Sequence, residues 1–71
     1  MKAEQLVKGQ PYLWVDQDGQ SRPVKYVEKC THPQKGEDGY KFKISGYDNR
    51  YVILPKSEVE RVVFRSSITP L

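Results

Sequence analysis

The sequence has one cysteine, one histidine and no long apolar run. A single cysteine, Cys30, rules out an intramolecular disulfide, so packing must hold the chain together, with or without self-association. No stretch approaches the ~20 apolar residues that cross a bilayer, and the first ten residues lack the apolar segment of a signal peptide. We therefore expect a cytoplasmic protein in a reducing compartment, with no membrane partner.

The chain is also short, and its charges nearly balance. Its 71 residues form one domain with a thin core, because a chain of this size buries only roughly 60% of the surface that it exposes when unfolded. This leaves no room for a buried catalytic cavity. The net charge of +3 arises in residues 40–71, with six basic and three acidic residues, whereas residues 1–39 balance. This basic half is either a solvated surface or one that attracts nucleic acid, anionic lipid or acidic protein.

The clearest pattern lies in residues 40–55. Apolar and polar residues alternate up to a turn sequence at 46–49, and a β-branched apolar run follows. This period of two is typical of a β-hairpin that buries Phe42 and places Lys41 and Lys43 on the opposite face. The expected core face consists of Tyr40, Phe42 and Ile44.

Turn signals divide the preceding part of the chain into two more strands. The first is expected over 12–15 and ends at an Asp-Gly turn, and the second over 22–31. Alternation is imperfect in the second strand. A bulge after Tyr26 would let both Val24 and Val27 reach the core.

The remaining segments are a loop, a helical turn, a last strand and two termini. Residues 32–39 contain Pro and two Gly and form the longest loop. A single short helical turn is expected over 54–60 and a last strand over 61–65. Residues 1–5 and 66–71 lack a pattern, which predicts loose termini.

Five strands in meander order with one helical turn before the last resemble the SH3-like small β-barrel. The most specific part is 54–60, which looks like the strand, proline and short 3-10 turn before the last strand of such barrels. The resemblance covers roughly 6–65 and implies an all-β fold, a single SH3-like domain over 1–71. An OB-like barrel is the alternative. It is disfavoured because that fold carries a helix between its third and fourth strands, where this chain has a tight turn.

An enzymatic function finds little support. Residues 51–62 are similar in layout to the end of the plasmid-borne type II dihydrofolate reductases, which are tetrameric SH3-like barrels. Aligning that family's Val-Gln-Ile-Tyr pore strand places Val52 at its Gln position and Leu54 at its Tyr position, so the polar groups for cofactor and substrate are missing. Cys30 and His32 supply two of the four ligands that zinc needs. We expect no enzyme, no catalytic residue, no cofactor and no metal site.

The aromatic residues are the better indication of function. The chain has five tyrosines and one tryptophan, which either fill a thin core or form a binding surface. Tyr12 or Trp14, together with Tyr47 and Tyr51, are expected to be exposed. SH3-like barrels of several kinds bind proline-rich peptides, methylated lysine or single-stranded nucleic acid through such rings. We therefore expect a protein-interaction module that binds a protein or peptide partner or a second copy of itself, with an exposed patch near Trp14 and Val63.

The alternative is a nucleic-acid binder that resembles KOW- or Tudor-type barrels. It predicts that five cations gather on one surface near Tyr47 or Tyr51: Lys25, Lys41, Lys43, Arg50 and Arg65. The interaction module ranks first because the net charge is small and a KOW-type Gly-rich signature is absent. The candidate binding residues are Trp14, Tyr47, Tyr51, Lys41, Lys43 and Arg50.

Overall fold

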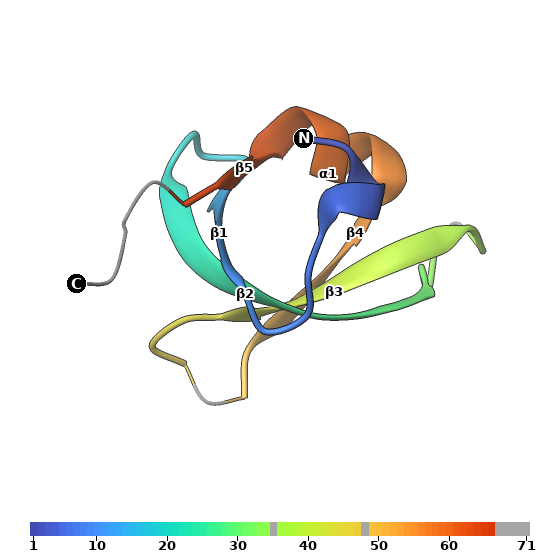
Figure 1. The fold of residues 1–71 in the computed structure, drawn as a ribbon, viewed down its shortest axis with the longest axis horizontal. Helices are drawn as coiled ribbons and strands as arrows, with labels where there is room; N and C mark the ends of the chain where they lie inside the picture. Colours follow the sequence, from blue (N-terminus) through green and yellow to red (C-terminus); the bar gives the residue numbers. More distant parts are fainter. Residues whose placement is uncertain (35, 48, 67–71) are drawn as a thin grey trace.

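The computed structural model describes residues 1–34, 36–47 and 49–66. They form an all-β domain with five antiparallel strands in one sheet (Figure 1). The strands are β1 (Pro11–Val15), β2 (Ser21–Thr31), β3 (Asp38–Ile44), β4 (Tyr51–Pro55) and β5 (Val63–Arg65), and the helices are the 3-10 turn η1 (Ala3–Gln5) and α1 (Lys56–Val62). No helix in these ranges is long and apolar enough to cross a membrane. Apart from Ser66, the tail predicted over 66–71 lies outside the described residues.

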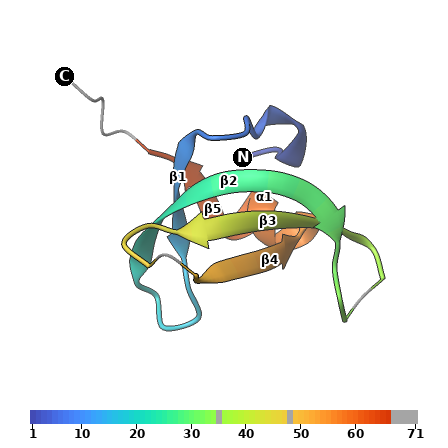
Figure 2. The same cartoon turned by 90° about the horizontal axis from the view of Figure 1, so that it is seen from below.

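The strand order is β4-β3-β2-β1-β5. Successive strands from β1 to β4 pair with one another, and β5 returns to pair with the free side of β1. Helix α1 therefore connects the two edge strands, β4 and β5. Figure 2 shows β2 arching over β3 and β4, so the sheet curves around the core. This curvature leaves one concave face for the core and one convex outer face.

Strand β2 bends at a β-bulge. Its register with β3 shifts between Tyr26 and Glu28, which confirms the predicted irregularity after Tyr26. The bulge increases the local twist and lets a long strand follow the curved sheet. Val24 is fully buried, but Val27 is only partly buried, so the bulge does not bring both valines to the core as expected.

The core is built around Phe42. This side chain is fully buried, and its ring centroid lies 5.4 Å from that of Tyr26 and 6.5 Å from that of Tyr12, the latter edge to face. Val59 of α1 is also fully buried and covers the concave face. The predicted core face of β3 is confirmed, with Ile44 packing at its margin. The buried core consists of Ala3, Tyr12, Val24, Tyr26, Tyr40, Phe42, Leu54, Val59 and Val63.

The C-terminal elements differ from the prediction. The expected single turn is a helix of seven residues that ends at Val62, about two turns, and β5 begins only at Val63. The helix continues because the amide of Val63 still donates to the carbonyl oxygen of Val59. Strand-favouring valines in the sequence pointed to an earlier start of the strand, but burial of Val59 and Val63 decides the boundary. Val63 thus faces the core and Phe64 is exposed.

The N-terminal segment packs against the domain, in contrast to the loose arm expected for residues 1–5. Ala3 is buried in the core. The Met1 ammonium donates to carbonyl oxygens of α1 and β5, both at 3.4 Å, and Glu4 forms an ion pair with Lys56 of α1 at 3.3 Å. One small apolar residue and a few polar contacts therefore order a segment too short to be recognised as a helix from its sequence.

Gly39 lies at a crowded point of β3. A Cβ placed on it would lie 2.8 Å from Cγ2 of Ile53 and 3.0 Å from the amide nitrogen of His32. We expect Gly39→Ala to lower the free energy of unfolding by about 1–3 kcal/mol, the usual cost of overpacking. Urea denaturation measures the loss, with Ser21→Ala at an exposed strand end as control. An unchanged midpoint for Gly39→Ala would contradict the packing of β3 against β4.

Candidate nucleic-acid interface

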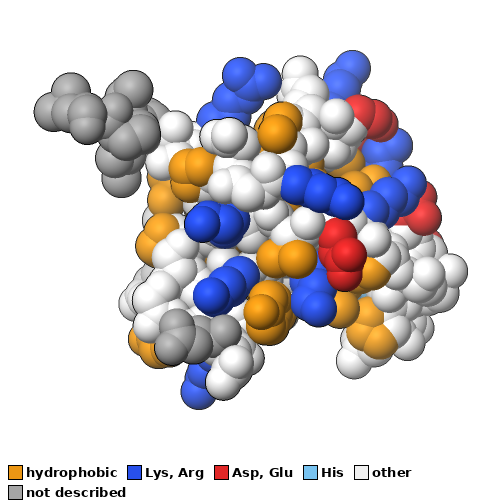
Figure 3. All heavy atoms as spheres, turned by 60° about the horizontal axis from the view of Figure 1, so that its bottom comes forward, with side chains coloured by type: hydrophobic (Ala, Val, Ile, Leu, Met, Phe, Trp, Pro, Cys, Tyr) orange, Lys and Arg blue, Asp and Glu red, His pale blue; other side chains and the backbone are white. Residues whose placement is uncertain are grey.

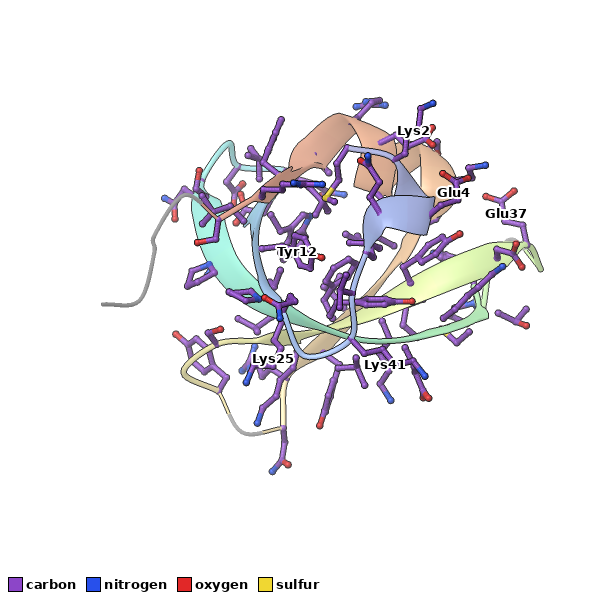
Figure 4. All side chains as sticks on the ribbon, in the orientation of Figure 1. Lys2, Glu4, Tyr12, Lys25, Glu37 and Lys41 are labelled. Carbon is purple, nitrogen blue, oxygen red and sulfur yellow. The ribbon has the colours of Figure 1, made fainter. Side chains whose placement is uncertain are left out.

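A row of side chains crosses the outer face of the sheet. Lys25 of β2, Lys43 of β3 and Tyr51 of β4 are direct cross-strand neighbours. They point away from the core because successive residues of a strand face opposite sides. Figure 4 shows Lys25 and Lys41 on this outer side, opposite Tyr12, which points into the interior. In Figure 3, which looks at this side, Lys and Arg side chains lie among hydrophobic ones, with acidic side chains between some of them.

The β3–β4 hairpin carries two pairs of a cation and an aromatic ring. The Lys41 Nζ lies 4.7 Å from the centroid of the Tyr51 ring, and the Arg50 Cζ lies 5.7 Å from that of Tyr47. Tyr47 is 52% exposed and Tyr51 is 48% exposed. Such pairs contribute about 0.5–1 kcal/mol at exposed sites. Each pair holds a positive charge beside an accessible ring.

The cations of the outer face and of the hairpin tip do not pair with carboxylates in the described ranges. The ion pairs there join Arg22 to Asp16, Lys29 to Asp38, Lys56 to Glu4, and Arg61 to Glu58. None of them involves Lys25, Lys41, Lys43 or Arg50. The carboxylate nearest in register is Glu28, the cross-strand neighbour of Lys41. Within the described ranges, the four cations thus have no carboxylate in an ion pair with them.

Two hollows adjoin the exposed ring of Tyr47. The first, of about 210 Å³, is lined by Lys25, Lys43, Ser45, Gly46 and Tyr47. The second, of about 370 Å³, is lined by Trp14, Asp16, Arg22, Ile44, Tyr47 and Arg50. Trp14 comes from β1, far from the hairpin in sequence, but it shares this hollow with two of the other candidate binding residues.

The wall of the second hollow is held in place by Asp16. Its carboxylate accepts hydrogen bonds from the amides of Asp18 and Gln20, both at 3.0 Å, and from the Arg22 guanidinium. The Arg22 bond, followed by the backbone bonds, lowers the pKa of Asp16 below its usual value of 3.8. Because the folded-state pKa is depressed, this stabilisation is present above the unfolded-state pKa and is lost as the pH falls through the folded-state pKa.

We expect Asp16→Asn to lower the stability at neutral pH by removing the charge while keeping an acceptor oxygen for the backbone amides. The difference from the parent should shrink as the pH falls below the usual range of an aspartate, because the parent carboxylate is then protonated as well. Urea denaturation across pH measures this difference, with Asp18→Asn as control. A difference that stays constant with pH would contradict the charged contact with Arg22.

The structure separates two predicted residues from this site. Arg65 lies on β5, which β1 separates from Lys25 on β2, and alternation places it on the same side of its strand as Val63. It therefore does not join the other four cations.

Val63 is fully buried, so the prediction of an exposed patch around it is wrong. Trp14 is only partly exposed and packs against the core. Tyr12 is buried, and its hydroxyl accepts a hydrogen bond from the Val7 amide at 2.9 Å.

Several site residues were missed by the sequence analysis. Arg22, Ser45 and Gly46 line the two hollows. Gly46 has a φ of +88°, the left-handed conformation that its turn sequence indicated. The turn itself was predictable, but its position beside Lys25 depends on how β2 and β3 pair. The one available signal for Arg22 was an acidic turn six residues earlier in the sequence.

The predicted pair Cys30 and His32 offers little to a metal. In the described part of the chain, no group of three or more His, Cys, Asp and Glu side chains could hold a metal ion. Cys30 is the cross-strand neighbour of Gly39, and Nδ1 of His32 accepts a hydrogen bond from the amide of Gln34 at 3.2 Å. Two protein ligands do not complete the four of a structural zinc site.

Comparison of the chain with protein-family models, with curated proteins and with solved structures gives no match. The function is therefore inferred from the geometry of the outer face. That geometry places lysines without an ion-pair partner in the described ranges beside the exposed Tyr51 ring on one convex surface of a small β domain.

Proposed function

We propose that the chain binds single-stranded nucleic acid through the outer face of β2, β3 and β4. The observation that carries this proposal is the cross-strand row of Lys25, Lys43 and Tyr51, with Lys41 over the Tyr51 ring. Lysines attract backbone phosphates, and exposed rings stack on bases. Stacking requires bases that are not already paired and stacked in a duplex, which favours a single strand.

The outer face brings lysines and an exposed aromatic ring close together. Lys43 lies one strand spacing from Tyr51 and Lys25 lies two, and neighbouring strands are about 4.8 Å apart. A phosphate held by Lys43 therefore lies close to a base on Tyr51. Because Lys41 covers one face of that ring, a base would stack on the other face. The hairpin tip offers a second such arrangement in Tyr47 and Arg50.

We further propose that the domain is an SH3-like barrel. The order of its strands, the helix between β4 and β5, and the bulge in β2 support this. Helix α1 links the edge strands and covers the concave face, as expected where a small sheet protects its edges. The fold alone does not define the ligand.

Fluorescence anisotropy of a labelled single-stranded oligonucleotide tests the proposed function. The association constant should fall as the salt concentration rises. If three lysines contact phosphates, the slope of log K against log salt should be about −2, because each contact on a single strand contributes about −0.7. A duplex of the same length should bind more weakly. Binding that is independent of salt would contradict a phosphate-contacting surface.

A protein-interaction function is the second candidate, and an apolar row on the outer face favours it. Phe64 of β5 is 48% exposed; its cross-strand neighbour is Leu13, whose other neighbour is Pro23. An apolar row that starts at the edge strand β5 is a surface that a second copy of the chain can cover. Sedimentation velocity at rising concentration tests self-association, and Phe64→Ser should abolish it. A monomer at every concentration would contradict self-association through this row.

A further inference from the structure

We propose that the smaller hollow, on the outer face, binds a terminal phosphate, so that the chain prefers a single strand with a phosphorylated end to one with hydroxyl ends. The phosphate lies between Lys25 and Lys43, and the nucleotide that carries it extends toward Tyr51. This inference rests on the proposed function and deepens it, because a basic outer face alone would bind a strand anywhere along its length.

The hollow opens on the same face as the basic row. Lys25 and Lys43 are cross-strand neighbours there, and Ser45, two residues after Lys43, points to the same side by alternation. The Ser45 amide donates to a carbonyl oxygen of β2 at 3.0 Å, which continues the ladder past the two lysines and holds Ser45 beside them. Gly46 and Tyr47 complete the hollow, whose volume is about 210 Å³.

Two positive charges meet in this hollow. The cross-strand pairing of Lys25 with Lys43 places their Cβ atoms about 4.5–5.5 Å apart, and like charges in such a pair are destabilising. In the part of the chain that the structure describes, no carboxylate forms an ion pair with either lysine. An anion between the two ammonium groups would replace one repulsion by two attractions, and two negative charges would balance them.

A terminal phosphate matches this hollow better than an internal one. A phosphate monoester carries about −1.5 to −2 charges at pH 7 and three acceptor oxygens, whereas a diester within the strand carries a single charge and one free oxygen fewer. The donors of the hollow are the ammonium groups of Lys25 and Lys43 and the hydroxyl group of Ser45. Each oxygen of the monoester can therefore accept a hydrogen bond from a different side chain, and such charge-assisted bonds are stronger than neutral ones.

The basic row then places the rest of the nucleotide. Tyr51 follows Lys43 in the row, so its strand lies about one and a half strand spacings, about 7 Å, from the midpoint between the two lysines. One sugar separates a terminal phosphate from its base, and that base stacks on the open face of the Tyr51 ring. Lys41, whose Nζ lies 4.7 Å from the centre of that ring, contacts the next phosphate along the strand.

Fluorescence anisotropy with oligonucleotides of one sequence, labelled internally, tests the inference at constant ionic strength. Their ends carry a 5′-phosphate, a 3′-phosphate, the methyl ester of either phosphate, or hydroxyl groups only. One of the two phosphorylated strands should bind about four- to twenty-fivefold more tightly than the hydroxyl strand, because each lysine contributes about two- to fivefold as an exposed charge pair. Its methyl ester should lose most of this preference, since it has one charge and one free oxygen fewer.

Two lysine variants separate the hollow from general attraction to a more highly charged strand. Lys25→Gln removes one wall of the hollow and should reduce the preference for the phosphorylated end by about two- to fivefold. Lys41→Gln is the matched control, because it removes the same charge from the same face but does not line the hollow. It should weaken both strands and leave their ratio unchanged. An equal fall of the ratio in both variants would overturn the inference.

Amide chemical shifts distinguish a failure of this inference from a failure of the proposed function. The phosphorylated strand should shift the signals of Lys25, Lys43 and Gly46 further than the hydroxyl strand does. Strands that bind equally well whatever their ends, and that shift Lys41 and Tyr51, would overturn the terminal-phosphate site and leave the proposed function standing. If no strand binds, the proposed function is wrong and this inference is wrong with it.

Discussion

Phe42→Ala should lower the free energy of unfolding by about 3–5 kcal/mol, as expected for removing a large aromatic side chain from a core. Phe42 is fully buried and its ring packs against those of Tyr12 and Tyr26, so the substitution leaves a cavity between three strands. Domains have a total stability of only about 5–15 kcal/mol, and a small one has little to spare. Urea denaturation followed by circular dichroism measures the loss.

The chain contains its own matched control for this substitution. Phe64, the only other phenylalanine, is 48% exposed on β5, and Phe64→Ala should change the stability by less than about 1 kcal/mol. Similar losses for both variants, or a stable Phe42→Ala, would contradict the assignment of Phe42 to the concave face and of Phe64 to the outer face.

The double substitution Lys41→Glu with Lys43→Glu should weaken binding of a single-stranded oligonucleotide by about a hundredfold at low salt. Two phosphate contacts of up to about 1 kcal/mol each are lost, and two repulsive charges take their place. The stability should stay within about 1 kcal/mol of the parent, because both side chains lie on the outer face. Anisotropy and urea denaturation measure the two effects.

A charge-matched control distinguishes a local site from general attraction. Lys2→Glu with Arg61→Glu changes the net charge equally, but it acts near α1, across the molecule from the outer face of β2 and β3 (Figure 1). Binding should fall far less in this variant. Equal losses in the two double variants would contradict a site on the outer face and favour nonspecific attraction to a basic protein.

The parts of the fold that could be predicted are those with a clear local sequence pattern. Strict alternation around Phe42 defined the central hairpin and its two faces, and a break in alternation after Tyr26 indicated the bulge. The end of α1 could not be predicted, because Val62 favours a strand on its own while the burial of Val59 and Val63 sets the boundary. The packing of Ala3 was equally out of reach, since three residues contain no period.

The candidate site likewise has a part that the sequence predicts and a part that it does not. Lys41 and Lys43 share a face by strand geometry alone, so their association was predictable. The neighbour relation of Lys25 and Lys43 depends on the register on one side of the bulge. The meeting of Trp14 with Tyr47 depends on how β1 and the hairpin tip approach each other. Such contacts come from tertiary packing, which a single sequence does not encode in any local pattern.

Amide chemical-shift mapping with single-stranded oligonucleotides, at low salt and again at raised salt, tests the proposed interface most directly. A phosphate-binding outer face predicts shifts that cluster at Lys25, Lys41, Lys43 and Tyr51 and disappear as salt is raised. Shifts that centre on Phe64 and persist at high salt, or no shifts at all, would contradict nucleic-acid binding by this face.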